Sequence, residues 1–303
     1  MTDGLVVAIA TAGRAELLHR TLLSLSRCRK PDIFRGVVVV ENGPKGDAEE
    51  ICRSFASDLS LRYEYTQRAN KSNALNRALD TISDCLVFFT DDDVRVHPGT
   101  LEAYACASQG TETKQFYGGP VAVDYEKPPP AWLKQYLPYS VGGWTFDGDS
   151  EDLDDEDLLF LGANWTGFAA DIREVGGFDP AYGPGSRTGR RGQEKDAQRR
   201  LWRNGCERVY VPDALVWHYV PRDRCTPQWA LDRGYQTQRA VGAMQAETGR
   251  GVFAVPRLCL GLSRAILRRG IRVFSPDPRM RFDAEYRLRV YLGYLQGHID
   301  WFQ

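Results

Sequence analysis

Three consecutive carboxylates, Asp91, Asp92 and Asp93, follow an apolar run at residues 86–89 in the stretch LVFFTDDDV. A short apolar run of this kind is typical of a strand buried on both faces of a mainly parallel sheet, whose ligands bind beyond the carboxyl ends of the strands. In an extended chain, residues two apart point to the same side, so we expect Asp91 and Asp93 to share a face. Two facing carboxylates repel unless a cation joins them, and oxygen ligands suit Mg²⁺ or Mn²⁺. The triplet therefore indicates a divalent-metal site, and the alternative is a solvated acidic turn.

The chain before the triplet alternates apolar runs with helical patterns. Strands are expected at residues 5–10, 36–40, 61–65 and 86–89, and one of the intervening helices is expected at residues 71–82. This alternation predicts a doubly wound sheet with right-handed crossovers. Thr11, Glu41 and Asp91 end three of these strands, so they are expected on one rim, where nucleotides usually bind.

Composition and missing motifs exclude several classes of function. No G-x-G-x-x-G follows the first strand and no G-x-x-x-x-G-K-[ST] occurs, so neither an ordinary dinucleotide fold nor a P-loop enzyme is expected. The net charge of −1 gives no basic field for nucleic acid. The seven cysteines are scattered without a C-x-x-C pair, which favours neither a zinc site nor disulfides. With no signal-peptide pattern and no apolar run of membrane-spanning length, a cytoplasmic protein is expected.

Several motifs in a fixed order carry a resemblance to a known family. They are a first strand followed by TAGR, then VVVVENG, NKSNALN, FFTDDDV, GGFD, GQEKD with LWRNG, and VPDALVWH. This order resembles the family 2 glycosyltransferases, inverting enzymes with the GT-A fold, over roughly residues 4 to 222. The resemblance implies an α/β fold with a doubly wound, mainly parallel sheet. It also implies a nucleotide-sugar-binding half at residues 1–125, an acceptor-binding half at 126–222 and a C-terminal helical segment at 223–303.

The resemblance implies roles for the residues that bind the nucleotide. Thr11 and Arg14 in the first turn, and Glu41 with Asn42 after the second strand, would hold the base and ribose. Carboxylates and amides suit this because they accept hydrogen bonds from ring N–H groups and ribose hydroxyls. Lys71, which opens a helix, would meet the diphosphate, since helix N-termini favour anions.

The resemblance also implies a metal site. Asp91 and Asp93 match the D-x-D motif of the family, which binds the Mn²⁺ or Mg²⁺ that bridges the diphosphate. Asp92, at the middle position, would contact the ribose or donor sugar. His218, after Val216 and Trp217, lies where many GT-A enzymes have a further metal ligand.

Two positions depart from the family pattern. The family usually has Glu-Asp where this chain has Gln193-Glu194, and the second of these is the expected catalytic base. Glu194 keeps the carboxylate, so we expect it to be the base, and Asp196 is the competing candidate. Asn70 stands at a position that is commonly Gly.

Aromatic and basic residues in the second half are further candidates. Trp144 and Trp165 are expected to stack on the apolar face of an acceptor sugar, and the alternative for both is a place in the core. The loop at residues 182–192 is rich in Gly and Arg. Its arginines are expected either to close over the donor diphosphate or to be solvated; they are Arg187, Arg190 and Arg191.

The expected activity is the transfer of a sugar, with inversion, from a nucleotide-diphosphate donor to a hydroxyl group. A UDP-sugar is the favoured donor, and the acceptor would be a glycan, a lipid-linked molecule or a small molecule. One alternative is a nucleotidyltransferase on a similar sheet, although the turn at residues 11–14 is too short for the glycine-rich loop of such enzymes. The other alternative is a non-catalytic sugar- or partner-binding module.

The C-terminal segment mixes apolar and basic residues. Between Arg257 and Phe274 the chain reads RLCLGLSRAILRRGIRVF. A basic amphipathic helix often lies at an interface, so peripheral contact with the inner face of a membrane is one expectation. The other is that the helix packs on the rest of the protein with its arginines solvated.

Overall fold

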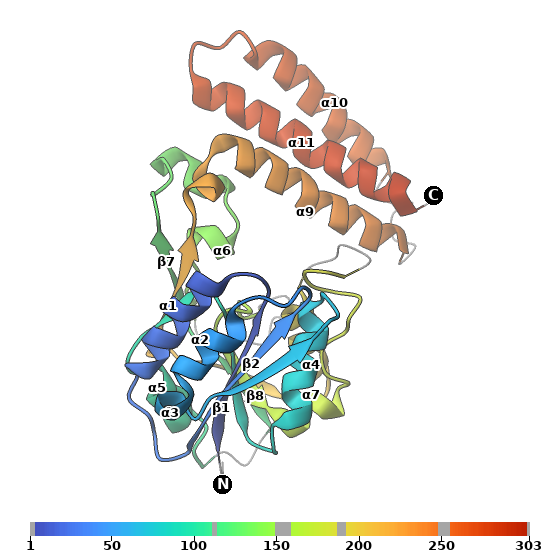
Figure 1. The fold of residues 1–303 in the computed structure, drawn as a ribbon. Helices are drawn as coiled ribbons and strands as arrows, with labels where there is room; N and C mark the ends of the chain where they lie inside the picture. Colours follow the sequence, from blue (N-terminus) through green and yellow to red (C-terminus); the bar gives the residue numbers. More distant parts are fainter. Residues whose placement is uncertain (1–3, 111–113, 149–158, 187–191, 248–254, 302–303) are drawn as a thin grey trace. The chain divides into compact units, whose positions relative to one another are not determined.

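The computed structural model describes residues 4–110, 114–148, 159–186, 192–247 and 255–301. These residues form two compact units (Figure 1). We call residues 1–124 with 142–219 the sheet unit, and residues 125–141 with 220–303 the helical unit. Arg187, Arg190 and Arg191, for which the sequence leaves a diphosphate contact and solvation both open, lie outside the described residues.

A seven-stranded sheet forms the centre of the sheet unit, with strand order β3-β2-β1-β4-β8-β6-β9. The strands are β1 (Leu5–Thr11), β2 (Phe34–Asn42), β3 (Arg62–Thr66), β4 (Leu86–Asp91), β6 (Gln115–Gly118), β8 (Trp165–Phe168) and β9 (Glu207–Tyr210). The strands β3, β2, β1 and β4 run parallel, as β6 and β9 do, while β8 is antiparallel to both of its neighbours. The predicted mainly parallel α/β sheet is therefore confirmed.

Helices cover both faces of this sheet and explain why its strands are apolar throughout. Alternate residues of β1 enter two different cores, with Val7 and Ile9 in one and Ala8 and Ala10 in the other. The first core is closed by α1 (Ala15–Ser26), α2 (Ala48–Ser54), α3 (Ala56–Leu59) and α5 (Thr100–Ala107). The second is closed by α4 (Lys71–Thr81), α7 (Ala169–Glu174) and α8 (Gln193–Arg203).

The register of the strands brings their polar ends to one rim. Thr11 pairs with Glu41 across β1 and β2, and Ala10 pairs with Asp91 across β1 and β4. A second, three-stranded sheet has the order β5-β10-β7, with β5 (Val94–Val96), β7 (Val121–Tyr125) and β10 (Val216–Val220). In it His218 pairs with Val94, one residue beyond the acid triplet, so a residue distant in sequence reaches the same rim.

The helical unit is built on three helices, α9 (Pro227–Glu247), α10 (Val255–Arg272) and α11 (Pro278–Trp301). It also includes η1 (Ala131–Tyr136) and η3 (Arg222–Cys225), and α6 (Tyr139–Gly142) lies at its boundary. Helices α9 and α11 approach closely at glycines: a Cβ atom at Gly242 would lie 2.2 Å from the Tyr294 carbonyl oxygen, and one at Gly293 would lie 2.2 Å from that of Tyr235. Within the described residues, no helix combines the length and apolar character needed to cross a membrane.

The division into units differs from the segments expected from the sequence. Residues 125–141 group with the C-terminal helices rather than with an acceptor-binding half. Leu133 of η1 packs with Leu231 of α9 and Phe282 of α11 in a separate apolar cluster, which explains this grouping.

Candidate active site

The acid triplet forms a tight turn between two strands. Asp91 is the last residue of β4, Asp92 and Asp93 form the turn, and Val94 begins β5. Asp91 and Asp93 therefore come together because the chain turns, and not because they alternate along one extended strand as the sequence suggested. Asp92 points back into the protein, where it is fully buried and its Oδ2 accepts a hydrogen bond of 2.7 Å from the Thr11 hydroxyl.

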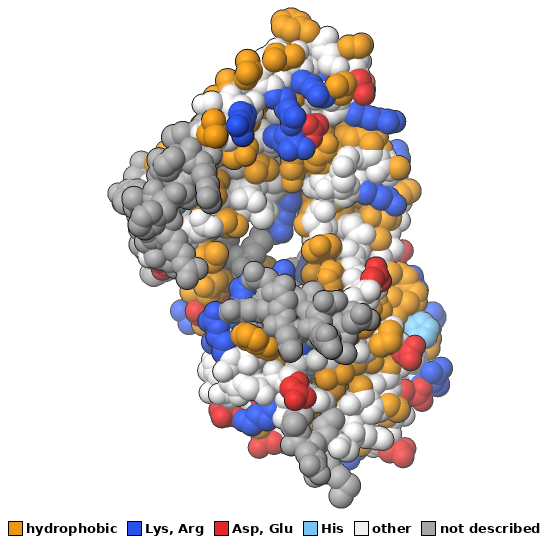
Figure 2. Space-filling view, turned by 180° about the vertical axis from the view of Figure 1, so that it is seen from behind, with side chains coloured by type: hydrophobic (Ala, Val, Ile, Leu, Met, Phe, Trp, Pro, Cys, Tyr) orange, Lys and Arg blue, Asp and Glu red, His pale blue; other side chains and the backbone are white. Residues whose placement is uncertain are grey.

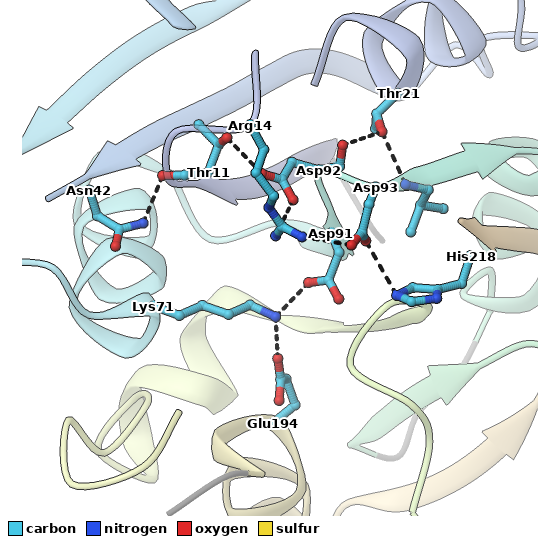
Figure 3. Close-up of polar contacts among 11 residues, drawn as sticks. Thr11, Arg14, Thr21, Asn42, Lys71, Asp91, Asp92, Asp93, Glu194 and His218 are labelled. Carbon is cyan, nitrogen blue, oxygen red and sulfur yellow. Dashed lines mark hydrogen bonds and ion pairs between the residues drawn. The ribbon is translucent and has the colours of Figure 1, made fainter. Parts of the chain in front are cut away.

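Thr21 holds this turn in place and was missed in the sequence. Its hydroxyl donates to the Asp92 carbonyl oxygen at 2.8 Å and accepts from the Val94 amide at 3.1 Å. Both contacts are drawn in Figure 3. The sequence offers one signal that points to Thr21: it is a hydroxyl residue within the apolar face of α1, and a buried polar group in such a position needs a hydrogen-bond partner.

The turn, together with β10, creates a group of possible metal ligands. Asp91, Asp93 and His218 each offer one atom, and these atoms all lie within 4.8 Å of one another. His218 Nε2 is 3.4 Å from Asp93 Oδ1, whereas Nδ1 is buried and has no hydrogen-bond partner among the described residues. Two carboxylates and an imidazole fit Mn²⁺, and the two carboxylates fit Mg²⁺ as well.

Two cations lie among the carboxylates (Figure 3). Arg14 pairs with Asp92 and with Asp93, whose Oδ2 lies 2.7 Å from Nη1. The Lys71 ammonium lies 2.5 Å from both Asp91 Oδ1 and Glu194 Oε1. When all are ionised, the four carboxylates of the site carry two more charges than these two cations balance. A divalent cation would neutralise that excess, which is a second reason why the residues fit a metal ion.

Burial and charge shift the pKa values of three of these groups in different directions. Burial alone would lower the pKa of Lys71, but attraction from Asp91 and Glu194 outweighs it and holds the pKa above its ordinary value. Burial would raise the pKa of Asp91, but the Lys71 charge lowers it overall. Burial raises the pKa of Asp92 to about 6, although Arg14 opposes this shift.

Glu194 reaches the cluster from the first turn of α8. Its Oε1 accepts hydrogen bonds from Lys71 Nζ at 2.5 Å and from the side-chain Nε2 of Gln193 at 2.6 Å. Its Oε2 makes no hydrogen bond to any described residue. Gly162 lies directly against it, because a Cβ atom there would be 2.4 Å from Glu194 Cδ. The carboxylate is therefore held through one of its two oxygens.

Asp196, the competing candidate for the base, has a structural contact instead. Its Oδ2 accepts from Arg200 Nε at 3.0 Å and Nη2 at 2.7 Å. Arg200 also donates to the Gly177 carbonyl oxygen at 2.7 Å, so the ion pair ties α8 to the turn after α7. Asp196 does not join the carboxylates around Lys71.

The two polar residues at the end of β2 are engaged within the chain. Glu41 is 1% exposed, and its carboxylate accepts from the Gly46 amide at 2.8 Å and from the Tyr63 hydroxyl at 2.6 Å. The Asn42 side chain donates to the Thr11 carbonyl oxygen at 2.8 Å. These bonds shape the rim where the nucleotide was expected.

Asn70, the second departure from the family pattern, has a clear local role. Its side chain accepts from the Asn73 amide at 2.9 Å and so caps the start of α4, the helix that presents Lys71.

The two candidate sugar-binding tryptophans have different environments. Trp165 is fully buried and its ring stacks on Phe89 at 4.7 Å between centroids, so the expected sugar contact at Trp165 is corrected to a place in the core. Its position on β8, between β4 and β6, turns the ring into the second core. Trp144 is partly buried and makes edge contacts with Phe160 and Tyr210.

With this geometry established, comparison with known proteins identifies the class. The family described as "Glycosyltransferase like family 2" matches residues 3–234. The chain belongs to this family, as the motifs predicted, and it is a glycosyltransferase.

Two relatives are each named "Validoxylamine A glucosyltransferase". They come from Streptomyces hygroscopicus subsp. jinggangensis (strain 5008) and S. hygroscopicus subsp. limoneus. Each is 26% identical over 92% of this chain, which covers 67% of the first relative and 63% of the second.

Solved structures show the same GT-A fold. The mannosyltransferase PcManGT from Pyrobaculum calidifontis, in complex with GDP-Man and Mn²⁺, has a TM-score of 0.61 at 18% identity, with 100% of this chain and 88% of that one covered. GalNAc-T7 with UDP, GalNAc and Mn²⁺ has a TM-score of 0.53 at 12% identity, with 72% and 44% covered.

Proposed function

We propose that this enzyme transfers a sugar from a nucleotide-diphosphate donor to an acceptor hydroxyl, with inversion and with the help of a divalent metal ion. The observation that carries the proposal is the Asp91, Asp93 and His218 donor set, whose atoms lie within 4.8 Å of one another at the rim where the parallel strands end. An ion held there would offset the charge of the departing diphosphate. The Mn²⁺ named with two solved relatives of the fold supports Mn²⁺ as the first ion to test.

Glu194 is the proposed base. Lys71 and Gln193 hold its Oε1, which leaves Oε2 to take the proton of the acceptor hydroxyl as that oxygen attacks the anomeric carbon. The competing Asp196 is paired with Arg200, and a carboxylate in that ion pair is poorly placed to serve the cluster around Lys71.

The nucleotide is proposed to bind along the ends of β1 and β2. Thr11, Arg14, Glu41 and Asn42 all lie on this rim, and Arg14 and Lys71 supply positive charge close to the metal ligands. We propose a UDP-sugar as donor, although the solved structures of the same fold contain GDP-Man in one case and UDP in the other. The assay therefore includes donors that carry uracil and donors that carry guanine.

The relatives' printed names favour glucose as the sugar and a small-molecule hydroxyl as the acceptor. Glycan and lipid-linked acceptors are the alternatives, and Trp144 is the remaining candidate for stacking on a sugar. Six of the seven cysteines have side chains that the structure describes, and all six are unpaired thiols, which supports a reducing compartment such as the cytoplasm as the place of reaction.

A donor panel without acceptor separates the possible functions. The enzyme is incubated with Mn²⁺ and with UDP-glucose, other UDP-sugars and GDP-mannose, and slow hydrolysis is measured. Release of free sugar and a nucleoside diphosphate supports the proposal. In a separate incubation with a nucleoside triphosphate and a sugar phosphate, release of pyrophosphate would indicate a nucleotidyltransferase. Binding of the donors without turnover in either incubation would indicate a non-catalytic module.

A further inference from the structure

One side of α10 holds large apolar side chains in solvent. Leu260, Leu267, Ile271 and Phe274 are 53%, 65%, 66% and 88% exposed. The first three lie on α10 and Phe274 follows its last turn, at spacings of seven, four and three residues that return to one side of a helix. We call these four residues the apolar ridge. A helix of a globular protein normally turns such a face inward, so a row of this size calls for an explanation.

The opposite side of α10 is already used for packing. Ala265 is buried there, and Arg269 pairs with Glu285 of α11 at 2.5 Å. Helix α10 therefore meets α11 through a side that carries charge, and the apolar ridge faces away from it. Within the described residues nothing covers the ridge, as its exposure shows.

A basic hollow lies beside the ridge, between α10 and α11. It has a volume of about 360 Å³, and its lining is Gly261, Arg264, Ala265, Arg268, Arg287 and Tyr291. Asp283 pairs with two of its three arginines, at 3.9 Å from Arg268 and 3.0 Å from Arg287. Three guanidinium groups against one carboxylate leave the hollow positive. Arginine is suited to phosphate because its planar group donates two parallel hydrogen bonds.

The hollow and the ridge are neighbours on the same helix. Arg264 stands between Leu260 and Leu267 in sequence, and Arg268 follows Leu267 directly. Figure 2 shows hydrophobic and basic side chains gathered together on the face of the helical unit that it draws. An anionic group bound in the hollow would thus lie beside a row of apolar side chains.

We propose that this surface docks on an anionic phospholipid bilayer. Headgroup phosphates enter the arginine hollow, and the apolar ridge enters the boundary between headgroups and acyl chains. The charge complementarity selects an anionic membrane over a second copy of this chain, which would bring another positive hollow to the same place. The inference goes beyond sugar transfer, since none of its residues belongs to the active site.

Flotation of the chain of residues 1–303 with lipid vesicles tests the proposal. Binding is expected with vesicles of phosphatidylcholine and phosphatidylglycerol in equal amounts, and much weaker binding with phosphatidylcholine alone. Changing Leu267, Ile271 and Phe274 together to Ser should weaken binding about tenfold or more, because apolar area that enters the membrane is removed. The variant should still fold, since these three side chains are exposed. Changing Arg264 to Gln should weaken it about fivefold, and only with the anionic vesicles.

The matched control changes three other exposed apolar residues of the helical unit, Met244, Leu292 and Ile299, together to Ser. It should bind vesicles within about twofold of the unchanged protein, and donor hydrolysis in solution should be the same for every variant. Equal binding to both kinds of vesicle, or equal loss in the control, would overturn the proposal. The proposal would also be overturned if the unchanged protein were a dimer and the ridge variant a monomer, because the ridge would then be a contact between two copies of the chain. Saturable binding of inorganic phosphate without vesicle binding would also reject it.

Discussion

Lys71 Nζ lies 2.5 Å from Glu194 Oε1, and this contact joins residues 123 positions apart in the sequence. Lys71 begins α4 and Glu194 lies in the first turn of α8, so two helix N-termini meet at the acid triplet. A cation is disfavoured at a helix N-terminus, whereas a carboxylate is favoured there. Lys71 is therefore held in place by Asp91 and Glu194 rather than by its own helix. It ties the proposed base to the proposed metal site.

Replacing Glu194 by Gln should lower sugar transfer by about 10²–10⁴-fold, the usual worth of a positioned general base. Donor binding should barely change, because the amide keeps the shape of the side chain. Steady-state transfer and donor titration measure the two effects. Asp196→Asn is the comparison: if it abolishes transfer while Glu194→Gln remains active, Asp196 is the base.

Replacing Lys71 by Gln should lower transfer by about 10–100-fold, since charge-assisted hydrogen bonds to the half-buried Asp91 and the buried Glu194 are lost. Most of the effect should appear as a higher KM for the donor, because the site gains a net negative charge near the diphosphate. Lys127→Gln, at an exposed position, is the matched control for loss of one lysine. Unchanged kinetics for Lys71→Gln would show that its contact with Glu194 has no part in the reaction.

Metal removal should weaken the binding of UDP. Calorimetric titration with Mn²⁺ and with EDTA is expected to differ by about tenfold or more, because the ion would balance charge on both the carboxylates and the diphosphate. Asp93→Asn should bind UDP with the weaker affinity under both conditions, whereas Asp58→Asn, at an exposed position, should behave as the unchanged protein. Equal affinity with Mn²⁺ and EDTA would remove the metal from the mechanism and leave the fold untouched.

Asp92 should make stability depend on pH in a defined direction. Its pKa is raised in the folded protein from 3.8 to about 6, so folding favours the protonated form. The resulting stabilisation is complete below the unfolded pKa and is lost as the pH rises through the folded pKa. In EDTA, the free energy of unfolding relative to Asp92→Asn should therefore fall by about 2 kcal/mol between pH 4 and pH 6. A difference that does not change with pH would contradict this assignment.

Much of the sheet unit could be predicted because its signals are local. The run ending at Asp91 became β4, and the polar ends at Thr11 and Glu41 lie on one rim, since parallel strands share the direction of their ends. His218 required more than local pattern. The antiparallel pairing of β10 with β5 brings it to Asp93, and only the resemblance to the family pointed to it in the sequence.

Other features depended on contacts that no local pattern encodes. The alternation of an extended strand gave the wrong reason for the proximity of Asp91 and Asp93, because the chain turns at Asp92. Trp165 was indistinguishable from a surface tryptophan until β8 was placed between two other strands. The Lys71–Glu194 contact depends on the meeting of two helices from distant parts of the chain.

The stereochemistry of donor turnover tests the central claim most directly. Proton NMR can follow the sugar released from an α-linked UDP-sugar, in the presence of Mn²⁺ and with enough enzyme to outrun spontaneous interconversion of the anomers. Inverting transfer with Glu194 as base predicts that the β anomer appears first, together with UDP, and that Glu194→Gln forms neither. Initial release of the α anomer would show retention of configuration and would contradict the proposed mechanism.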